Sequence, residues 1–591
     1  MAGKNRLMAR LVATSATITP DSDYIATNLT KTQPTAVALD VYSSIDSLPA
    51  SAETGTKALV TGNNTLYIYN NGWYKIAIIN NFNPQWITQP NSTYDLAING
   101  AATSITVVAS DSDDVPITYI ATPDSDFLTF ATVTHDSDKD NTWIIQPVDS
   151  ENGAATGGTG TVTFKASDGV NLVQALSTFS LTFGPNWSVA PTETKLTSSD
   201  IQAGDNFGTD VSISSDGNYA IVGAYAEDAG GSDAGAAYVF TRSGSSWTQQ
   251  AKLVASDAGV DNWYGDSVAI SSDGTYAIVG ADKANANKGA AYIYTRSGST
   301  WTQQARIVAS DAAVSDGFGA HVSISSDGDY VIVGKANDNS YAGAAYIFTR
   351  SGSTWTQQAK ITASDAQASD YFGYGVKISS DSIYAIVGAP FEDAGGSSAG
   401  AAYIFSRSGS TWTQQAKLVV SDAQASDFAG WDSSINSDGT YAVVGVRRED
   451  GGAGDPIADA GAAYIFTRDS DTWTEQQKLT ASDAQSSDEF GYSVYMSDDG
   501  SYVVVGATDE DGGVGDPLSS AGAAYVFERD GSTWTEVRKI TTSDALADNR
   551  ISAKVSINSD GSYVIIGAQY TDGGSGNINN NSGAAYIYEA G

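Results

Sequence analysis

The chain has 591 residues, and its 68 acidic and 30 basic side chains leave a formal charge of −38. Such a charge repels nucleic-acid phosphates and anionic lipid, so neither is expected as a partner. There is no cysteine and hence no disulfide, while 60 Gly, 31 Tyr and 12 Trp are typical of an all-β protein. We expect no secretory signal peptide, because Lys4, Arg6 and Arg10 precede no apolar segment, and no membrane insertion.

The first 83 residues predict an extension and a small β module. Residues 1–40 show no hydrophobic pattern, and we expect an attachment arm that orders only on a partner. Residues 41–83 predict two or three strands, with an Asn70-Asn71-Gly72 turn before Trp73-Tyr74. Residues 66–76 resemble modules of structural proteins in tailed phages of marine bacteria. The resemblance implies a virion structural protein.

Residues 84–185 predict an Ig- or cadherin-like β-sandwich of about 100 residues. The strand-like runs lie at residues 104–109, 117–119, 143–145, 161–166 and 177–183. Asp111, Asp113 and Asp114 resemble a cadherin calcium element, with a solvated turn as the alternative. The order of small module, sandwich and display domain also resembles phage fibres.

Two sequence markers recur seven times in the rest of the chain. The first, Tyr-Ala-Ile-Val-Gly or a close variant, starts at Tyr219 and at residues 276, 330, 384, 441, 502 and 563. The second, Gly-Ala-Ala-Tyr, starts at Gly235 and at residues 289, 343, 400, 461, 522 and 583. The period varies from 54 to 61 residues, but subtracting the loop between the two markers leaves 45 each time. All length variation therefore lies in one loop per repeat.

Each repeat predicts four antiparallel strands, in the first copy at residues 211–214, 219–223, 236–241 and 247–254. Seven such units predict a seven-bladed β-propeller over residues 186–591. A β-solenoid is the alternative, but it would need much shorter repeats. The last copy ends after its third strand, at Glu589, whereas residues 187–200 read like an isolated fourth strand, with Trp187 matching Trp247. We expect residues 187–196 to complete the last blade and close the ring.

The repeat resembles the FG-GAP repeat of integrin α-subunit propellers, especially its bacterial and viral form. Phe-Gly occurs at residues 207, 318, 372 and 490, and Gly388-Ala389-Pro390 is a complete Gly-Ala-Pro element. Tyr264, Ala429 and Ile551-Ser552 depart from Phe-Gly, and Lys335 and Val446-Arg447 replace parts of Gly-Ala-Pro. The resemblance implies ligand binding or adhesion without naming a ligand. The family's Asp-x-Asp-x-Asp-Gly calcium turn is absent, since only Ser-Asp-Gly stands there.

Catalytic groups are scarce. The two histidines, His135 and His321, lie in different predicted domains, and no Ser-His-Asp, Cys-His or histidine-cluster arrangement can be assembled. We interpret His321 as a solvated loop residue. We predict a protein that is not an enzyme and requires no cofactor, with a paired-carboxylate glycosidase as the enzyme alternative.

The longest variable loops, in the last three repeats, are the predicted recognition sites, because ligand contacts concentrate on loops held by a rigid scaffold. The candidate ligand-binding residues are Arg447, Arg448, Asp455, Asp516, Asn577 and Asn579. Carboxylates among glycines in these loops suit Ca²⁺, which takes oxygen ligands. The candidate calcium ligands are Glu449, Asp450, Asp509, Asp511 and Asp516.

Two other repeated sets have a structural interpretation. Paired aspartates between repeats, such as Asp311 and Asp316, are expected to accept backbone hydrogen bonds. Tryptophans at residues 247, 301, 355, 412, 473 and 534 are expected to pack between neighbouring repeats, with stacking on sugar rings as the alternative.

Together these patterns predict a non-enzymatic fibre or display protein on the exterior of a tailed-phage virion. Its N-terminal modules would bind other virion proteins, and its propeller would bind a host receptor or surface glycan. A homo-oligomer, with a trimer as the first guess, is expected for a fibre. The alternatives are a bacterial adhesin, at the cell surface or secreted, and a carbohydrate-active enzyme.

Overall fold

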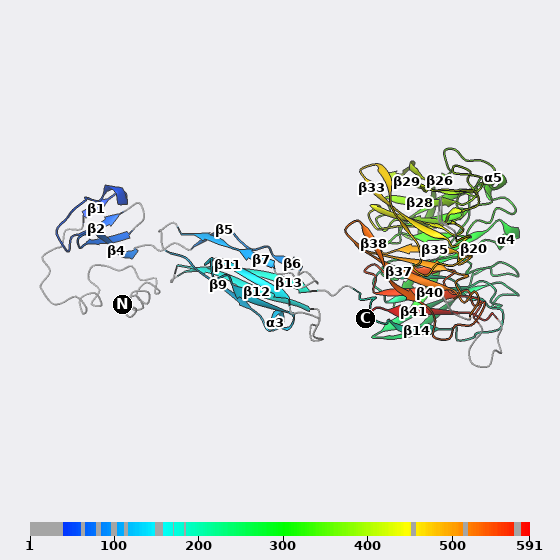
Figure 1. Cartoon of the computed structure of the whole chain (residues 1–591), viewed down its shortest axis with the longest axis horizontal. Helices are drawn as coiled ribbons and strands as arrows, with labels where there is room; N and C mark the ends of the chain where they lie inside the picture. The colour runs from blue at the N-terminus through cyan, green and yellow to red at the C-terminus, as the bar shows by residue number, and fades with distance from the viewer. Residues whose placement is uncertain are drawn as a thin grey trace. The chain divides into compact units, whose positions relative to one another are not determined.

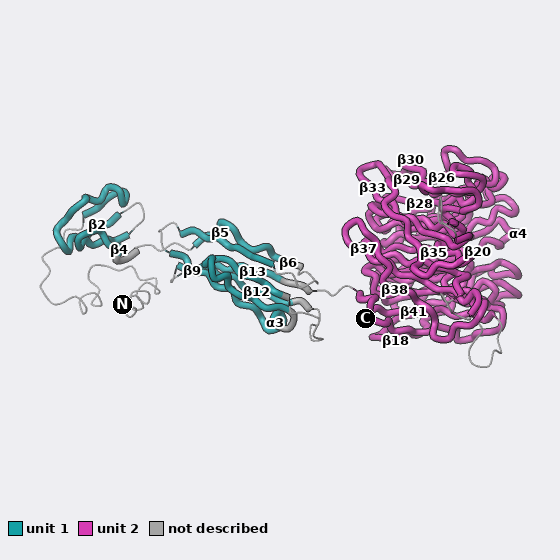
Figure 2. The backbone as a smooth tube through the Cα atoms, viewed as in Figure 1, with its two compact units in different colours: residues 1–183 teal, residues 184–591 magenta. Residues whose placement is uncertain are grey.

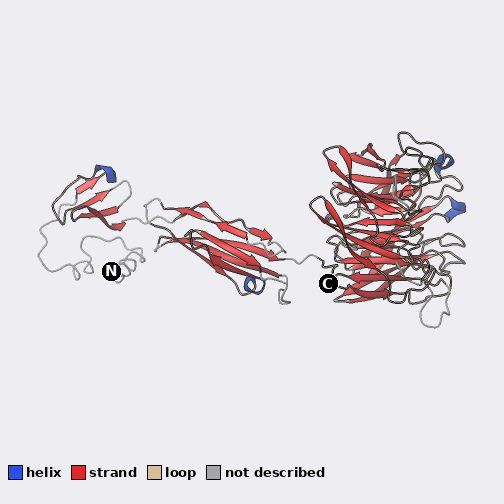
Figure 3. Cartoon of the chain, in the orientation of Figure 1, coloured by secondary structure: helices blue, strands red, loops and turns tan. Residues whose placement is uncertain are grey.

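A computed structural model of the chain divides it into two compact units, residues 1–183 and 184–591 (Figure 2). It describes residues 40–60, 65–78, 84–95, 103–111, 116–147, 158–168, 171–181, 185–450, 457–511, 518–571 and 581–591. Strands dominate the described part (Figure 3). Apart from Asp40, the predicted attachment arm lies outside the described residues. No helix among the described residues is long and apolar enough to cross a membrane.

The small N-terminal module is a four-stranded sheet in the order β1-β2-β3-β4. The strands are β1 (Asp40–Tyr42), β2 (Lys57–Val60), β3 (Thr65–Tyr69) and β4 (Trp73–Ile78), with the short 3-10 helix η1 (Ile45–Ser47). Alternate residues such as Ala58, Val60 and Tyr67 are buried, as expected when one face of a sheet is covered. The sequence predicted two or three strands here, and the sheet has four.

The following β-rich segment consists of sheets that share a core. Its elements are β5 (Gln85–Thr88), β6 (Thr93–Asp95), β7 (Thr103–Thr106), β8 (Val108–Ser110), β9 (Thr118–Pro123), α3 (Phe127–Phe130), β10 (Ala131–His135), β11 (Thr142–Pro147), β12 (Gly158–Ser167) and β13 (Leu172–Leu181). They form sheets ordered β10-β11-β7, β6-β13-β12-β9 and β5-β8. Ile105 and Trp143 from one sheet and Val162 and Phe164 from another lie in one buried cluster. The layered arrangement matches a sandwich, and its Ig or cadherin affiliation stays a prediction.

Residues 184–591 form seven four-stranded sheets, seen from the side in Figure 1. Residues from all seven sheets line one central channel. The first strands line the channel: β15 (Phe207–Ile213), β19 (Val268–Ile270), β23 (Val322–Ile324), β27 (Val376–Ile378), β31 (Ala429–Ile435), β35 (Phe490–Met496) and β39 (Val555–Ile557). The second strands are β16 (Tyr219–Ala224), β20 (Tyr276–Ala281), β24 (Tyr330–Lys335), β28 (Tyr384–Ala389), β32 (Tyr441–Val446), β36 (Tyr502–Ala507) and β40 (Tyr563–Ala568).

The two remaining strands of each blade lie farther from the channel. The third strands are β17 (Ala236–Ser243), β21 (Ala290–Ser297), β25 (Ala344–Ser351), β29 (Ala401–Ser408), β33 (Ala462–Asp469), β37 (Ala523–Asp530) and β41 (Ala584–Glu589). The outer strands are β18 (Ser246–Leu253), β22 (Thr300–Ile307), β26 (Thr354–Ile361), β30 (Thr411–Leu418), β34 (Thr472–Leu479), β38 (Thr533–Ile540) and β14 (Thr192–Leu196). One-turn segments α4 (Ala284–Asn287) and α5 (Asp338–Tyr341) occupy the short variable loops of blades two and three. The predicted seven-bladed propeller is confirmed.

The glycines of the repeat mark a close approach between neighbouring blades. A Cβ on Gly223, in the second strand of blade one, would stand 1.9 Å from the carbonyl oxygen of Gly265 in blade two. A Cβ on Gly235 would stand 2.0 Å from the carbonyl oxygen of Tyr264. No side chain fits there, so both sequence markers record backbone contact between blades.

The ring closes as predicted, because β14 pairs with β41 in the sheet ordered β14-β41-β40-β39. Thr192 lies opposite Glu589 and Leu196 opposite Ala585. In the other six blades Leu253 and its counterparts lie opposite the second Ala of Gly-Ala-Ala-Tyr, so β14 keeps the register of an outer strand.

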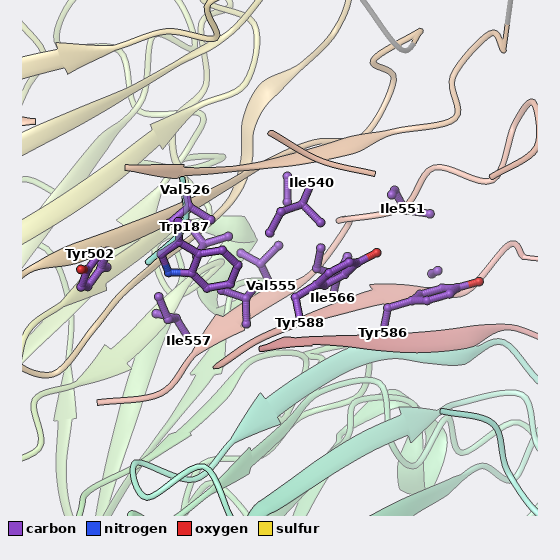
Figure 4. Packing of buried hydrophobic residues seen from close by; sticks show 14 of the residues in the cluster. Trp187, Tyr502, Val526, Ile540, Ile551, Val555, Ile557, Ile566, Tyr586 and Tyr588 are labelled. Atoms are coloured by element: carbon purple, nitrogen blue, oxygen red, sulfur yellow. The ribbon is translucent and has the colours of Figure 1, made fainter. Parts of the chain in front are cut away.

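Trp187 has a different role from the one its sequence match predicted. In six blades an arginine near the end of the third strand donates its Nε–H to a carbonyl of the first hairpin turn, as Arg242 does to Gly217 at 2.7 Å. In blade seven the Trp187 Nε1–H donates to Gly561 at 2.9 Å. Its ring is 2% exposed and packs among Tyr502, Ile557 and other apolar side chains (Figure 4). Matching Trp187 to Trp247 was therefore wrong, since Trp187 replaces the missing arginine.

Candidate functional site

Most repeated polar residues hold the blades together. In every blade the tyrosine hydroxyl of Gly-Ala-Ala-Tyr donates to the first aspartate of the connection between blades, as Tyr238 does to Asp200. The second aspartate accepts a backbone N–H, as Asp316 does from Ala313 at 2.5 Å. The predicted backbone hydrogen bond is thus confirmed for the second aspartate in five connections, whereas the first aspartate accepts a tyrosine hydroxyl instead. From blade two to blade six the outer tryptophans donate to a glutamine of the preceding blade, as Trp301 does to Gln250, which confirms packing between neighbours.

The predicted calcium ligands have protein partners where they are described. Glu449 is 1% exposed and lies 2.9 Å from the Lys478 ammonium, and Asp509 lies 3.0 Å from Arg550. Asp450 and Asp511 accept backbone N–H groups, from Asp459 at 2.7 Å and Ser520 at 2.6 Å. Asp516 lies outside the described residues. Within the described ranges no three His, Cys, Asp or Glu side chains are placed to hold a metal ion, and calcium binding stays a prediction.

Two of the six predicted ligand-binding residues can be placed. The Arg447 guanidinium carbon lies 3.4 Å from the centroid of the Trp431 ring and pairs with Glu489, and Arg448 pairs with the same carboxylate. Both guanidinium groups also lie near the Phe428 ring, at 5.4 and 5.7 Å from its centroid. Asp455, Asp516, Asn577 and Asn579 lie outside the described residues.

The sequence did not reveal the central channel, whose floor is a ring of hydroxyl groups. Equivalent positions at the first hairpin turn carry Ser in six blades and Asp498 in the sixth blade. Asp498 accepts hydrogen bonds from Ser215 in blade one and Ser380 in blade four, both at 2.7 Å. One carboxylate thus ties opposite sides of the ring together. Above it, Lys377 and Tyr495 join across the channel by a hydrogen bond.

The middle of the channel carries charged groups that differ from blade to blade. Asp210, His321, Asp432 and Lys554 line one cavity there. Asp210 accepts backbone N–H groups of its own and the next blade at 2.9 and 2.7 Å, and Asp432 does the same at 2.9 and 3.1 Å. These carboxylates therefore join adjacent first strands by hydrogen bonds and also contribute negative charge to the channel.

Burial and neighbouring charges set the protonation of these groups. Burial, with Lys554 nearby, holds the pKa of His321 well below its ordinary value, so the imidazole is neutral. Burial opposes the charge on Lys554, but the carboxylates of Asp432 and Asp210 outweigh it and raise the pKa of Lys554. Burial, with Asp282 and Asp210 adding to it, raises the pKa of Asp266 to about 8. At neutral pH Asp266 can therefore donate a hydrogen bond as well as accept one.

A cavity of about 220 Å³ opens at the channel end opposite the floor, and we call this end the mouth. The cavity is formed by residues of blades one, two, three, six and seven. Its lining includes Tyr225, Trp263, Asp266, His321, Tyr492 and Lys554. The variable loops lie on this same face, because Phe207 at the start of β15 pairs with Ala224, where the loop begins.

Aromatic side chains continue around the mouth beyond this cavity. Tyr374 lies 4.4 Å from Trp431, and Trp431 lies 5.8 Å from Tyr492, measured between ring centroids. Phe391 contacts Tyr371 and Phe428 at 4.8 and 5.1 Å. The mouth is thus walled by aromatic rings from blades one, two, four, five and six.

The residue before the Phe-Gly element has a left-handed backbone in all seven blades. Its φ is 55° at Asn206, 65° at Gly317 and 53° at Glu489, but also 55° at Trp263. Tyr371, Phe428 and Arg550 share this conformation. It suits Gly and Asn and costs a bulky residue about 1–2 kcal/mol. Strain of this kind is found where a side chain serves a function, so the three aromatic residues are functional candidates.

The structure corrects the interpretation of His321 as a solvated loop residue. It precedes β23, lines the channel and lies 5.1 Å from the Tyr374 ring. Comparing the residue directly after Phe-Gly, which neighbours the His321 position, across the repeats would have pointed to the channel. Those residues are Thr209, Asp266, Ala320, Tyr374, Trp431, Tyr492 and Ala553, which no shared packing role explains.

Comparison with known proteins agrees with this geometry, which is that of a seven-bladed β-propeller. A family model described as FG-GAP repeat matches residues 191–240, 247–294, 301–348, 355–405, 412–466, 473–527 and 534–588. These segments cover more than half of the chain, which therefore belongs to the FG-GAP repeat family. No curated protein matches the chain.

Several solved structures resemble the chain in fold. Kuenenia stuttgartiensis hydrazine synthase is 13% identical over 63% of this chain and 94% of its own, with a TM-score of 0.42. The WD40 repeats of RRP9 are 10% identical over 69% of this chain and 99% of theirs, with a TM-score of 0.42. The GH74 xyloglucanase from Xanthomonas campestris is 14% identical over 64% of this chain and 53% of its own, with a TM-score of 0.38. At these identities the likeness concerns fold and carries no argument about activity.

Proposed function

We propose that the chain is a non-enzymatic binding protein whose propeller recognises a surface glycan at the mouth of its channel. One observation carries the proposal. Residues that hold the blades together repeat almost unchanged, whereas the residues around the mouth vary between blades and include strained aromatic residues. Since packing would be served by one repeated residue, the differences favour a specific ligand.

The channel carboxylates support binding rather than catalysis. A glycosidase needs one carboxyl group that is free to protonate the leaving group and a second that is free to attack or to activate water. Both oxygens of Asp210 and of Asp432 accept backbone hydrogen bonds. Asp266 then lacks a free carboxylate partner among the residues that line the mouth cavity. Turnover of any polysaccharide by the purified chain would contradict this proposal.

We further propose display on the exterior of a tailed-phage particle, with the first unit contacting other virion proteins and the chain acting as a homo-oligomer. The resemblance of residues 66–76 to phage structural modules supports this, as does the charge of −38, which keeps the chain from anionic surfaces. A bacterial surface adhesin is the second candidate, favoured by the FG-GAP family match.

Two experiments separate these possibilities. Mass spectrometry of purified virions should detect the chain, and its absence from them would leave the adhesin. A glycan array should show binding by the full chain, and repeating it with EDTA tests the predicted calcium requirement. If no glycan binds with or without EDTA, the glycan proposal is wrong.

A further inference from the structure

The mouth cavity is small and is closed on its inner side, and both properties restrict the ligand that it can hold. Its volume of about 220 Å³ suits one sugar ring rather than a chain of them. Below it, Lys377 and Tyr495 join across the channel, and Asp498 bonds to both sides of the floor. A ligand can therefore enter only from the mouth and cannot thread through the ring.

The lining combines flat aromatic faces with polar groups, which is the chemistry that a pyranose needs. One face of a pyranose presents C–H groups that pack on an aromatic ring, while its rim carries hydroxyl groups that need donors and acceptors. Trp263 and Tyr225 lie 5.1 Å apart at the wall, and Asp266, His321 and Lys554 provide polar atoms.

Lys554 brings a positive charge to the lining of the cavity. Among the described residues no carboxylate lies within ion-pair distance of its ammonium, and it donates no hydrogen bond to them. Asp210 and Asp432 nevertheless stabilise its charge from farther away. Because those two carboxylates already balance it, a strongly anionic ligand would meet repulsion, whereas neutral hydroxyl groups would be accepted.

The backbone of Trp263 adds an independent observation. Its φ of 55° is a conformation that Asn or Gly adopts more cheaply, and Asn206 and Gly317 occupy the same position in blades one and three. The Trp263 ring lines the cavity and has the Lys283 ammonium 4.9 Å from its centroid. Holding a tryptophan there at a cost to stability is explained if the ring also contacts the ligand.

We propose that this cavity binds the single terminal pyranose residue of a neutral glycan, with Trp263 as the stacking platform and Asp266 and Lys554 bonding to its hydroxyl groups. The inference rests on the proposed glycan-binding function and narrows it to one site on the protein and to one sugar unit at the end of the glycan. It also places recognition at the channel rather than in the long loops of the last three blades.

The test uses the full chain and neutral oligosaccharides with defined ends, chosen from the glycan array, together with methyl glycosides of neutral hexoses and N-acetylhexosamines. Affinity is measured by saturation-transfer NMR and tryptophan fluorescence. Trp263→Asn should weaken binding at least about tenfold while leaving thermal stability equal or higher, because Asn relieves the left-handed strain. Asp266→Asn and Lys554→Met should each weaken binding as well.

Arg550→Asn is the matched control. Arg550 has the same backbone conformation, with a φ of 45°, but it does not line this cavity and adds no aromatic ring to the mouth. The variant should bind within about twofold of the unchanged chain. Removing the terminal sugar with an exoglycosidase should abolish binding.

The outcomes separate the site from the function. If glycan binding persists in the Trp263, Asp266 and Lys554 variants, the cavity assignment is wrong and the binding function stands. Binding that survives removal of the terminal sugar overturns the end-on mode. A chain that binds none of these glycans overturns both the site and the function.

Discussion

The ring closure gives a prediction that can be worked out from Trp187. Replacing it with Ala removes a ring that is 2% exposed and leaves the Gly561 carbonyl without its buried donor. Truncating a buried tryptophan costs about 3–5 kcal/mol, and an unpaired buried acceptor adds about 1 kcal/mol. Trp187→Ala should therefore lower the free energy of unfolding of the propeller by about 4–6 kcal/mol. Trp187→Phe keeps most of the packing, loses the donor and should cost about 1–2 kcal/mol.

Urea unfolding followed by tryptophan fluorescence measures this, because nine of the twelve tryptophans lie in residues 184–591. Trp247→Ala is the control, since Trp247 is only partly buried and contacts Tyr563 edge-on with ring centroids 6.5 Å apart. Truncating Trp247 should lower the free energy of unfolding by about 1–2 kcal/mol. The reasoning fails if Trp187→Ala unfolds within about 1 kcal/mol of the unchanged chain, or if Trp247→Ala is the more damaging of the two.

Three further predictions concern charged groups inside the ring. Lys335→Met should destabilise the propeller by about 3–5 kcal/mol in the same urea assay, because the fully buried ammonium lies within 3.3 Å of three carboxylates; a loss below about 1 kcal/mol would contradict this. Ala507 occupies the matching position in blade six, where burial and the Glu510 carboxylate raise the pKa of Asp488 to about 7. Protonated Asp488 therefore contributes its full stability below about pH 4, and this contribution is lost as pH rises through about 7. Ala507→Lys should make the free energy of unfolding fall less between about pH 5 and 8. Parallel plots of that free energy against pH for the variant and the unchanged protein would refute the idea. Asp498→Ala removes both bonds across the channel floor and should speed amide hydrogen exchange at the first hairpin turns of blades one and four; unchanged exchange there would show that the carboxylate does not hold the floor.

The blades were predictable because each builds its core from the same local pattern, and seven copies reveal which positions are constrained. Ring closure followed from the same pattern, since residues 192–196 keep the register of an outer strand. Trp187 was misread because its partner, Gly561, lies 374 residues away and nothing local marks the pairing. Lys335 looked like a departure from the repeat, yet it neutralises carboxylates that only the fold brings together.

The channel was harder to predict for a physical reason. Its lining takes one or two residues from each blade, and closure of the ring decides which side of the first strand faces the axis. Residues such as His321 and Lys554 are then neighbours across the channel although they stand in different repeats. The two arginines, Arg447 and Arg448, were found as candidates, but their position beside Trp431 and Phe428 depends on that closure.

The pairing of β14 with β41 also sets a time scale for making the protein. The two strands, at residues 192–196 and 584–589, are the first and last of the propeller to leave the ribosome. At about 5–20 residues per second, the ribosome needs roughly 20–80 s to synthesise the segment between them. Until β41 emerges, Trp187 and the edge of β14 have no partner, so the ring stays open for that interval. Conditions that slow translation would lengthen the exposure of this unpaired edge and of Trp187, and the nascent chain would then need protection from aggregation before its last strand arrives.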